Sequence, residues 1–284
     1  LLGACVVSLV GALDDMFDLP AGLKLLGQLG AATIPVVGGV YPANLTVPFF
    51  GGFELGWVAY PLTVLGIALV MNIVNLIDGI DGLAAGFCAI AAAAMAIIAV
   101  SLQRYEAGVL AAMTAGGAIG FLRYGFPPAS SFMGDTGSNL LGYMIAVASV
   151  QGALKTNAVI AMVFPLVILA VPLFDTAFVV AKRLKYRQPI FQADRWHFHH
   201  RMANIGFSQR RTLLYLYGWT LVLALLALAL RFVPYSDDRG NFDPLWTTIM
   251  AVVLLAALAV TVYLAFVLEI IKRPRWRDEQ NGED

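Results

Sequence analysis

The chain has 284 residues, of which 60% are hydrophobic and 13% are charged, whereas soluble globular domains average about 45–50% and about 25%. This composition excludes a soluble globular protein and indicates an integral membrane protein. Lys and Arg together number 18, as do Asp and Glu, so no net positive charge favours nucleic acid as a partner. Both cysteines, Cys5 and Cys88, lie inside apolar runs, which excludes a disulfide framework.

Long apolar stretches predict an all-α polytopic membrane protein, since a spanning helix needs about 20 mostly apolar residues. Nine stretches are separated by Pro, Gly or charged residues: 1–13, 25–41, 58–76, 83–101, 107–123, 138–152, 157–181, 212–233 and 245–271. The first is too short to span and has no initial Met, so we expect the chain to begin inside a helix. Residues 42–57 alternate apolar and polar side chains around Gly51 and Gly52, which predicts one short external β-hairpin.

The distribution of basic residues predicts the orientation, because cytoplasmic loops carry an excess of Lys and Arg. With Asp14 and Asp15 placed inside, 14 of the 18 basic residues become cytoplasmic. The four that remain outside are Arg104, Lys155, Arg231 and Arg239. We expect a single transmembrane domain over residues 1–272 and a cytoplasmic polar tail over 273–284. The polar regions 14–24, 72–83, 123–138 and 182–211 then share the cytoplasmic side.

The first polar region contains two adjacent carboxylates, Asp14 and Asp15. Carboxylates near a membrane core are costly and by default indicate function. Adjacent residues point about 100° apart on a helix, so these two cannot do the same job. Lys24 offers a nearby cation that could balance a phosphate. An acidic helix end in contact with water is the alternative.

A polar residue recurs at every third position of the next region, at Asn72, Asn75, Asp78 and Asp81. Successive members would lie about 60° apart on an α-helix, so neighbours can converge on one ligand. Hydrogen bonds between helices are the alternative for the two Asn residues.

Asp135 lies among glycines just before the stretch that begins at residue 138. Carboxylate and amide oxygens are hard ligands that suit Mg²⁺, which takes only one or two protein groups. We therefore predict a Mg²⁺ site at Asp135 with Asn75 as second ligand, where Mn²⁺ could substitute. An N-cap formed by Ser138 is the alternative.

All three histidines, His197, His199 and His200, fall in one loop, flanked by Arg195 and Arg201. Histidines can bind zinc, but the two Arg residues would repel a cation and instead suit phosphate. A solvated basic loop is the alternative.

The order of these motifs resembles the polyprenyl-phosphate N-acetylhexosamine-1-phosphate transferases (glycosyltransferase family 4) of bacterial cell-envelope synthesis. Their Gly-x-x-Asp-Asp-x-x-x-Leu-x-x-x-x-Lys pattern is similar to residues 11–24, and their Asn-x-x-Asn-x-x-Asp-Gly-x-Asp-Gly-Leu pattern to residues 72–83. Their Gly-Asp-x-Gly-Ser pattern is similar to residues 134–138. The loop at 197–201 resembles the His-x-His-His-Arg form of the GlcNAc-type branch. Members of that branch have about eleven spanning helices, so the resemblance implies that about two N-terminal helices are absent here.

The resemblance implies a role for each matching residue. The implied catalytic residues are Asp14, Asp15, Asp135, His199 and His200. The implied substrate-binding residues are Lys24, Asn72, Asn75, Asp78, Asp81, Arg195, His197 and Arg201. Asp135 would be the principal Mg²⁺ ligand, Asp14 or Asp15 would act on the lipid phosphate, and the histidine loop would close over the donor diphosphate.

The implied reaction transfers N-acetylhexosamine 1-phosphate, GlcNAc above all, from a UDP-sugar to undecaprenyl or a similar polyprenyl phosphate and releases UMP. It would be the first membrane step of a cell-envelope polysaccharide such as lipopolysaccharide or teichoic acid. Membrane lipids are further partners, and a homodimer is left open. The implied location is the bacterial plasma membrane, with many passes and the active site facing the cytoplasm.

Three alternatives differ from this prediction. A phospho-N-acetylmuramoyl-pentapeptide transferase of peptidoglycan synthesis would share the motifs, but its histidine loop resembles three consecutive histidines followed by Phe and Glu. An ion-coupled transporter would carry its carboxylates near the bilayer midplane with repeat symmetry, whereas these lie at one face without repeats. A CDP-alcohol phosphotransferase would need an Arg after the Asp-Gly motif and a later Asp pair, which residues 78–84 lack.

Overall fold

The computed structural model describes residues 1–47, 51–153, 206–233 and 243–270, together with isolated residues between 173 and 202. The chain divides into two compact units. Unit 1 contains Leu1–Pro172 and Leu216–Val233, and unit 2 contains Leu173–Tyr215 and Pro234–Asp284. Each unit is described by itself below.

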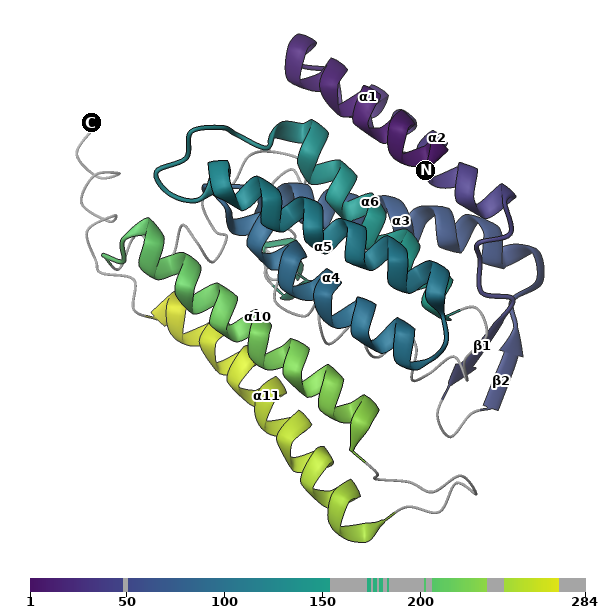
Figure 1. The fold of residues 1–284 in the computed structure, drawn as a ribbon, viewed down its shortest axis with the longest axis vertical. Helices are drawn as coiled ribbons and strands as arrows, with labels where there is room; N and C mark the ends of the chain where they lie inside the picture. Colours follow the sequence, from purple (N-terminus) through teal and green to yellow (C-terminus); the bar gives the residue numbers. More distant parts are fainter. Residues whose placement is uncertain are drawn as a thin grey trace. The chain divides into compact units, whose positions relative to one another are not determined.

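The described residues form eight long helices (Figure 1). They are α1 (Leu2–Phe17), α2 (Ala21–Val37), α3 (Ala59–Ile77), α4 (Leu83–Ser101), α5 (Tyr105–Gly125), α6 (Gly134–Ala153), α10 (Gln209–Phe232) and α11 (Pro244–Ile270). Each coincides with a predicted apolar stretch, and five helices in the described part of the chain are long and apolar enough to span a membrane. The predicted all-α membrane architecture is confirmed, while the stretch 157–181 lies almost entirely outside the described residues.

Three helix boundaries differ from the prediction at the polar motifs. Helix α1 continues to Phe17, so Asp14 and Asp15 lie inside it. Helix α2 begins at Ala21 and already contains Lys24. Helix α6 begins at Gly134 rather than at residue 138. Hydropathy marks where apolar residues end, whereas a helix continues as long as its backbone groups find partners.

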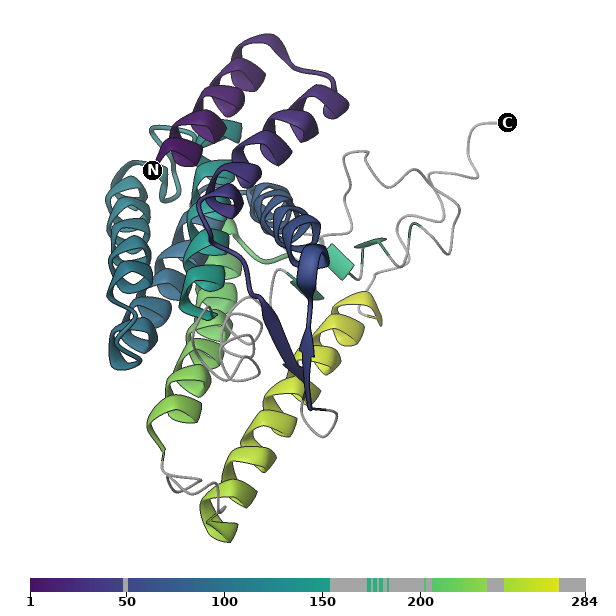
Figure 2. The same ribbon diagram turned by 90° about the vertical axis from the view of Figure 1, so that its right-hand side faces the viewer.

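The predicted hairpin is present as strands β1 (Asn44–Val47) and β2 (Gly51–Glu54), which pair antiparallel (Figure 2). Asn44 lies opposite Glu54 and Val47 opposite Gly51. In this register Gly51 and Gly52 belong to strand β2, opposite Val47 and Thr46. Alternation of apolar and polar residues identifies strands but does not locate the turn between them.

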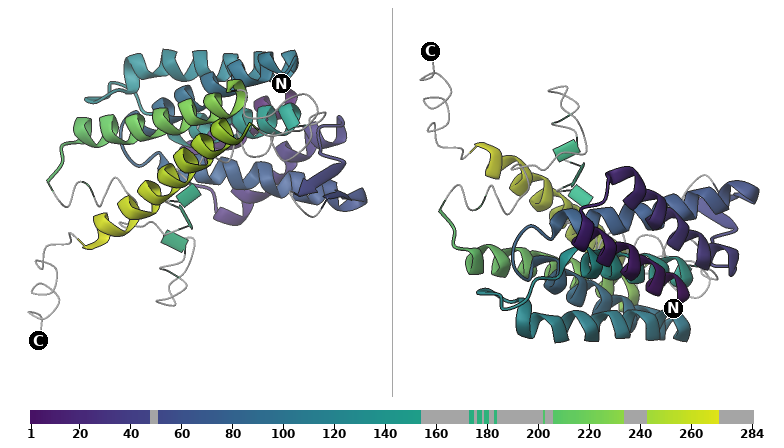
Figure 3. Two further views of the ribbon diagram at one scale, coloured as in Figure 1. Left: turned by 90° about the horizontal axis from the view of Figure 1, so that it is seen from below. Right: turned by 90° about the horizontal axis from the view of Figure 1, so that it is seen from above.

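Helices α1 and α2 form an antiparallel pair, joined by a short turn at residues 18–20 (Figures 2 and 3). Within the described part of unit 1, α6 packs against α1, α3, α4 and α5. Helix α4 is largely buried, and Ala84, Ala85, Ala91 and Ala92 are fully inaccessible. Small side chains of this kind let membrane helices approach closely.

Helix α4 runs parallel to the part of α10 that belongs to unit 1. Tyr217 donates a hydrogen bond of 2.5 Å from its hydroxyl to the Gly82 carbonyl at the start of α4. At the other end, Arg231 donates from Nε to Ser101 Oγ at 2.9 Å and from Nη2 to the Ser101 carbonyl at 3.0 Å. Arg231 therefore lies at the opposite end of α4 from the Asp-Gly motif, as the charge distribution predicts.

We predict that Gly86→Ala destabilises the protein. A Cβ at residue 86 would lie 2.0 Å from Tyr217 Cζ and 2.2 Å from its hydroxyl oxygen, so the ring must move and its bond to Gly82 is lost. Overpacking of this kind costs typically about 1–3 kcal/mol. The matched control is Gly116→Ala on α5, where an added Cβ meets nothing within 4 Å. Thermal unfolding in detergent should give a lower Tm for Gly86→Ala only, and equal values would contradict the packing.

Candidate active site

Three of the four predicted polar regions meet at one end of unit 1. Asp14 and Asp15 lie near the end of α1, Lys24 near the start of α2, Asn75 near the end of α3 and Asp135 at the start of α6. Ion pairs and hydrogen bonds connect all five residues, and Asp15 is joined through the backbone N–H of Asp135. The predicted convergence is confirmed for these regions. The histidine loop, with Arg195, His197, His199, His200 and Arg201, lies outside the described residues.

All four polar groups of Asp135, namely its two carboxylate oxygens, its backbone N–H and its carbonyl, form hydrogen bonds to other residues. Its carboxylate accepts a hydrogen bond from Lys24 Nζ at Oδ2 and one from Asn75 Nδ2 at Oδ1, the latter at 2.5 Å. Its backbone N–H donates to Asp15 Oδ1 at 2.7 Å, and its carbonyl accepts from Asn139 Nδ2 at 2.8 Å. Contacts from α1, α2 and α3 therefore fix this residue at the first turn of α6.

Asp14 and Asp15 make different contacts, in keeping with their adjacent positions on α1. The buried Asp14 pairs through Oδ2 with Lys24 Nζ at 3.0 Å and accepts from the Leu19 N–H at 2.9 Å. Asp15 is exposed and accepts from the N–H groups of Asp135 and Thr136, at 2.7 and 3.0 Å, and from the Thr136 hydroxyl at 2.6 Å.

Asp15 thus caps the N-terminus of α6 from a neighbouring helix, where a negative charge is favourable. Ser138 does not form the N-cap that stood as the alternative to a metal site, because its hydroxyl instead donates to the Gly134 carbonyl at 2.8 Å. Gly11 permits the close approach of α1 to this turn, since a Cβ there would lie 2.5 Å from the Thr136 Cα.

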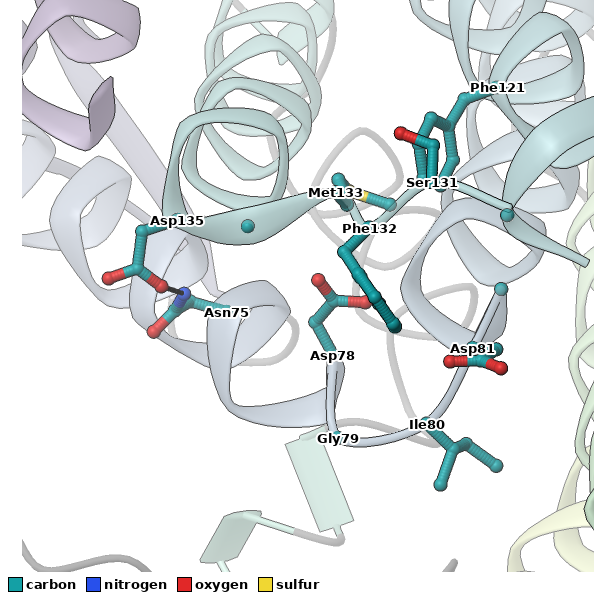
Figure 4. Close-up of a pocket in the computed structure, with 13 residues that line it drawn as sticks. Asn75, Asp78, Gly79, Ile80, Asp81, Phe121, Ser131, Phe132, Met133 and Asp135 are labelled. Atoms are coloured by element: carbon teal, nitrogen blue, oxygen red, sulfur yellow. Dashed lines mark hydrogen bonds between the residues drawn. The ribbon is translucent and has the colours of Figure 1, made fainter. Parts of the chain in front are cut away.

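A cavity of about 370 Å³ opens beside Asp135 (Figure 4). The residues that line it come from the end of α3, the following loop, the end of α5, the segment that precedes α6 and the start of α6. They are Asn75, Asp78, Gly79, Ile80, Asp81, Gly82, Phe121, Gly125, Ser131, Phe132, Met133, Gly134 and Asp135. Among the described residues, the lining contains three carboxylates and no Lys, Arg or His.

Asp78 and Asp81 lie in the loop between α3 and α4 rather than on a helix. Helix α3 ends at Ile77, so the predicted helical spacing applies only to the two Asn residues. Asp81 Oδ2 accepts from the Ala129 N–H at 3.3 Å. Burial raises the pKa of Asp78 to about 7, and the nearby Asp135 and Asp81 carboxylates act in the same direction.

Asn72 is not among the residues that line the cavity. Its Nδ2 donates to Gln28 Oε1 at 2.7 Å and to the Ala68 carbonyl at 2.8 Å. This is the interhelical bonding that stood as the alternative for the Asn residues, and a substrate contact at Asn72 stays a prediction.

The donor set suits a hard divalent cation. No three His, Cys, Asp or Glu side chains in the described residues are grouped so that they could hold a metal ion. Mg²⁺ needs only one or two protein oxygens and keeps several waters, and Asp135 and Asp78 offer carboxylates at the same cavity. Asn75 directs its NH₂ group to Asp135, so its role as second ligand stays a prediction.

Two pairs of residues at or near the site were not predicted from the sequence. Gln28 and Asn139 stand four residues after Lys24 and Asp135, so helical spacing from the predicted site could have identified them. Phe132 and Met133 line the cavity, and Phe132 is 81% exposed. Their only sequence signal is that they directly precede the Gly-Asp motif.

The sequence is similar to a known protein family and to several bacterial proteins. A family model described as glycosyl transferase family 4 matches residues 1–153. The probable undecaprenyl-phosphate N-acetylglucosaminyl 1-phosphate transferase of Bacillus subtilis is 42% identical over 231 residues, which cover 81% of this chain and 64% of that protein. The decaprenyl-phosphate N-acetylglucosaminephosphotransferase of Mycobacterium leprae is 32% identical over 277 residues, 89% of this chain and 70% of that protein.

A relative with another printed activity is also similar. The phospho-N-acetylmuramoyl-pentapeptide-transferase of Desulforudis audaxviator is 36% identical over 245 residues, 78% of this chain and 70% of that protein. The chain thus spans 64–70% of the length of these three relatives.

We predict that Asp15→Ala lowers stability because α6 loses its cap. Loss of a cap costs typically about 1 kcal/mol. Asp15→Asn should lose less stability than Asp15→Ala, since its amide oxygen can still accept from one of the two α6 N–H groups, while its NH₂ group cannot accept from the other. Thermal unfolding in detergent measures both variants. An unchanged Tm for Asp15→Ala would show that the contact does not stabilise the helix.

Proposed function

The chain belongs to glycosyl transferase family 4, and on this basis we propose that it transfers N-acetylglucosamine 1-phosphate from UDP-GlcNAc to a polyprenyl phosphate. The observation that carries the proposal is the convergence of Asp14, Lys24, Asn75 and Asp135 beside an acidic cavity at one end of the helices. The names of the B. subtilis and M. leprae relatives support undecaprenyl or decaprenyl phosphate as acceptor and GlcNAc as the sugar.

The proposed reaction is a phosphoryl transfer. An oxygen of the prenyl phosphate attacks the sugar-bearing phosphorus of UDP-GlcNAc, and the bond from that phosphorus to the bridging oxygen breaks, so UMP leaves. A lipid phosphate is largely dianionic at pH 7, with a second pKa of about 6, so no strong base is needed. The protein mainly has to position two polyanions and neutralise their charge.

Lys24 would supply positive charge where the two substrates meet. Its ammonium group lies between Asp14 and Asp135, so its position is fixed before substrate binds. Asp14 or Asp15, next to it, would face the lipid phosphate. In the part of the chain outside the described residues, Arg195, Arg201 and the three histidines would contact the donor diphosphate.

We propose Mg²⁺ as the cofactor, held by Asp135 with help from Asn75 and the neighbouring Asp78. The three carboxylates among the described lining residues would repel a nucleoside diphosphate, and a divalent cation between the two would offset this repulsion. When bound, Mg²⁺ supplies charge neutralisation for the diphosphate and the leaving UMP. Mn²⁺, which favours similar ligands, could substitute.

The chain is a multi-pass bacterial membrane protein, and we propose that its active site faces the cytoplasm. The distribution of Lys and Arg supports this side, and UDP-sugars are cytoplasmic substrates. The contact of Arg231 with Ser101 supports it too, because it places a predicted external residue at the opposite end of α4 from the site.

The donor assignment predicts faster turnover of UDP-GlcNAc than of UDP-MurNAc-pentapeptide. A pocket built for an unsubstituted sugar would clash with the lactyl-peptide. The complete protein, purified in detergent with undecaprenyl phosphate and Mg²⁺, is given each donor at equal concentration while UMP release is measured. Faster turnover of the pentapeptide donor would move the protein to the activity of its D. audaxviator relative, and no UMP from either would contradict the reaction.

The metal assignment predicts that Asp135→Asn reduces UMP release by about 100-fold or more across a Mg²⁺ titration, because the variant lacks the charge that holds the cation. The matched control is Asp243→Asn at the exposed start of α11, where Oδ1 accepts from the N–H groups of Leu245 and Trp246. Asn caps helices as well as Asp, so this control should keep wild-type activity. Near wild-type activity of a folded Asp135→Asn would remove Asp135 from the metal site.

A further inference from the structure

A second, uncharged polar layer lies one helical turn below the site. The ion-pair layer consists of Lys24 on α2, Asn75 on α3 and Asp135 on α6. The amide layer consists of Gln28, Asn72 and Asn139, which lie three or four residues away on the same helices. Residues at this spacing share a helix face. The same faces of α2, α3 and α6 therefore form both layers.

The hydrogen bonds of the amide layer run in one direction. Asn72 Nδ2 donates to Gln28 Oε1 at 2.7 Å, and Gln28 Nε2 donates to Asn139 Oδ1 at 2.8 Å. Asn139 Nδ2 then donates to the Asp135 carbonyl at 2.8 Å. Gln28 is the central member, because it accepts from α3 and donates to α6.

Two members of this layer are buried, with Gln28 1% and Asn139 2% exposed, and Asn72 is half-buried. Residues next to the amide layer on α2 and α3 belong to an apolar cluster that includes Ala31, Ala32 and Met71. Buried amides are costly unless they are hydrogen-bonded, and a fully bonded buried network selects one arrangement of its helices. An apolar side chain could fill the same space but would not specify the register.

Register between α2 and α6 is what the active site requires. Lys24 contacts Asp135. Four residues further along both helices, Gln28 contacts Asn139, so one alignment of α2 with α6 makes both contacts. A slip of one residue moves a side chain by about 1.5 Å along the axis and turns it by about 100°. Lys24 would then miss Asp135.

We propose that Gln28 is a positioning residue for Asp135, which acts through Asn139 and keeps α2 in register with α6. The proposal rests on the function proposed above, because Asp135 is the group whose placement it serves. Gln28 itself stands a full turn from the cavity and is not among its lining residues.

The test is Gln28→Met, which keeps the length of the side chain and removes both hydrogen bonds. A misplacement of about 1 Å costs up to about 100-fold in rate, so we expect kcat for UMP release from UDP-GlcNAc to fall about tenfold, with less than a twofold change in KM. The Mg²⁺ concentration for half-maximal activity should rise. The matched control is Thr63→Val, since Thr63 is buried in α3 and, among the described residues, its hydroxyl bonds only to Ala59 of its own helix. An unchanged kcat for Gln28→Met would overturn the proposal.

A combined variant separates positioning from stability. Gln28→Met, Asn72→Leu and Asn139→Leu together leave no unpaired amide, and replacement of both partners of a hydrogen bond by apolar groups is close to neutral for stability. We expect a Tm near wild type with kcat still reduced. Wild-type kcat in the combined variant would overturn the proposal, and this variant also serves if Gln28→Met does not fold.

Hydrogen exchange supplies a readout that does not depend on activity. Peptides that cover residues 134–139 should exchange faster in Gln28→Met than in wild type or Thr63→Val, because the first turns of α6 lose their lateral support. If wild type releases no UMP from UDP-GlcNAc, the proposed function fails, while this comparison still decides the role of Gln28. Equal exchange in all three proteins would overturn the positioning role.

Discussion

The contact between Lys24 and Asp135 is the interaction on which the described site depends. Charged groups beside an apolar helix bundle are costly unless they are paired, and this pair draws the start of α2 to the start of α6. Asp14 completes the pairing from α1, and Asn75 adds a hydrogen bond from α3. Four helix ends therefore meet at one point because a single carboxylate needs partners from each side.

This arrangement leaves the cavity with more negative charge than positive. Lys24 is shared by two carboxylates. Within the described part of the lining, Asp78 and Asp81 add negative charge and no Lys, Arg or His compensates it. Such a surface repels polyanions on its own. An acidic lining repels a diphosphate, and a divalent cation would offset this repulsion. The acidity of the cavity therefore favours the proposed cation.

Much of the architecture and part of the site could be predicted from residue order. The apolar stretches correspond to the eight described helices, and β1 and β2 form where polar and apolar residues alternate. The meeting of Asp14, Asn75 and Asp135 was predicted because each stands at the same end of its helix in an alternating topology. Apolar spans and alternating strands are patterns of residues that are close in sequence, so they can be recognised without knowledge of the tertiary structure.

The sequence by itself determined the membrane class, the number and order of apolar segments in the described residues, and which motifs share one end of the helices. Only the tertiary structure decided that α6 begins at Gly134, because its cap comes from Asp15, 120 residues away. It also decided that Gln28 supports Asn139 across 111 residues, and that Asn72 bonds to Gln28 and does not line the cavity. These outcomes depend on hydrogen bonds between helices, and local residue patterns cannot specify which distant donor meets which acceptor until the helices have packed.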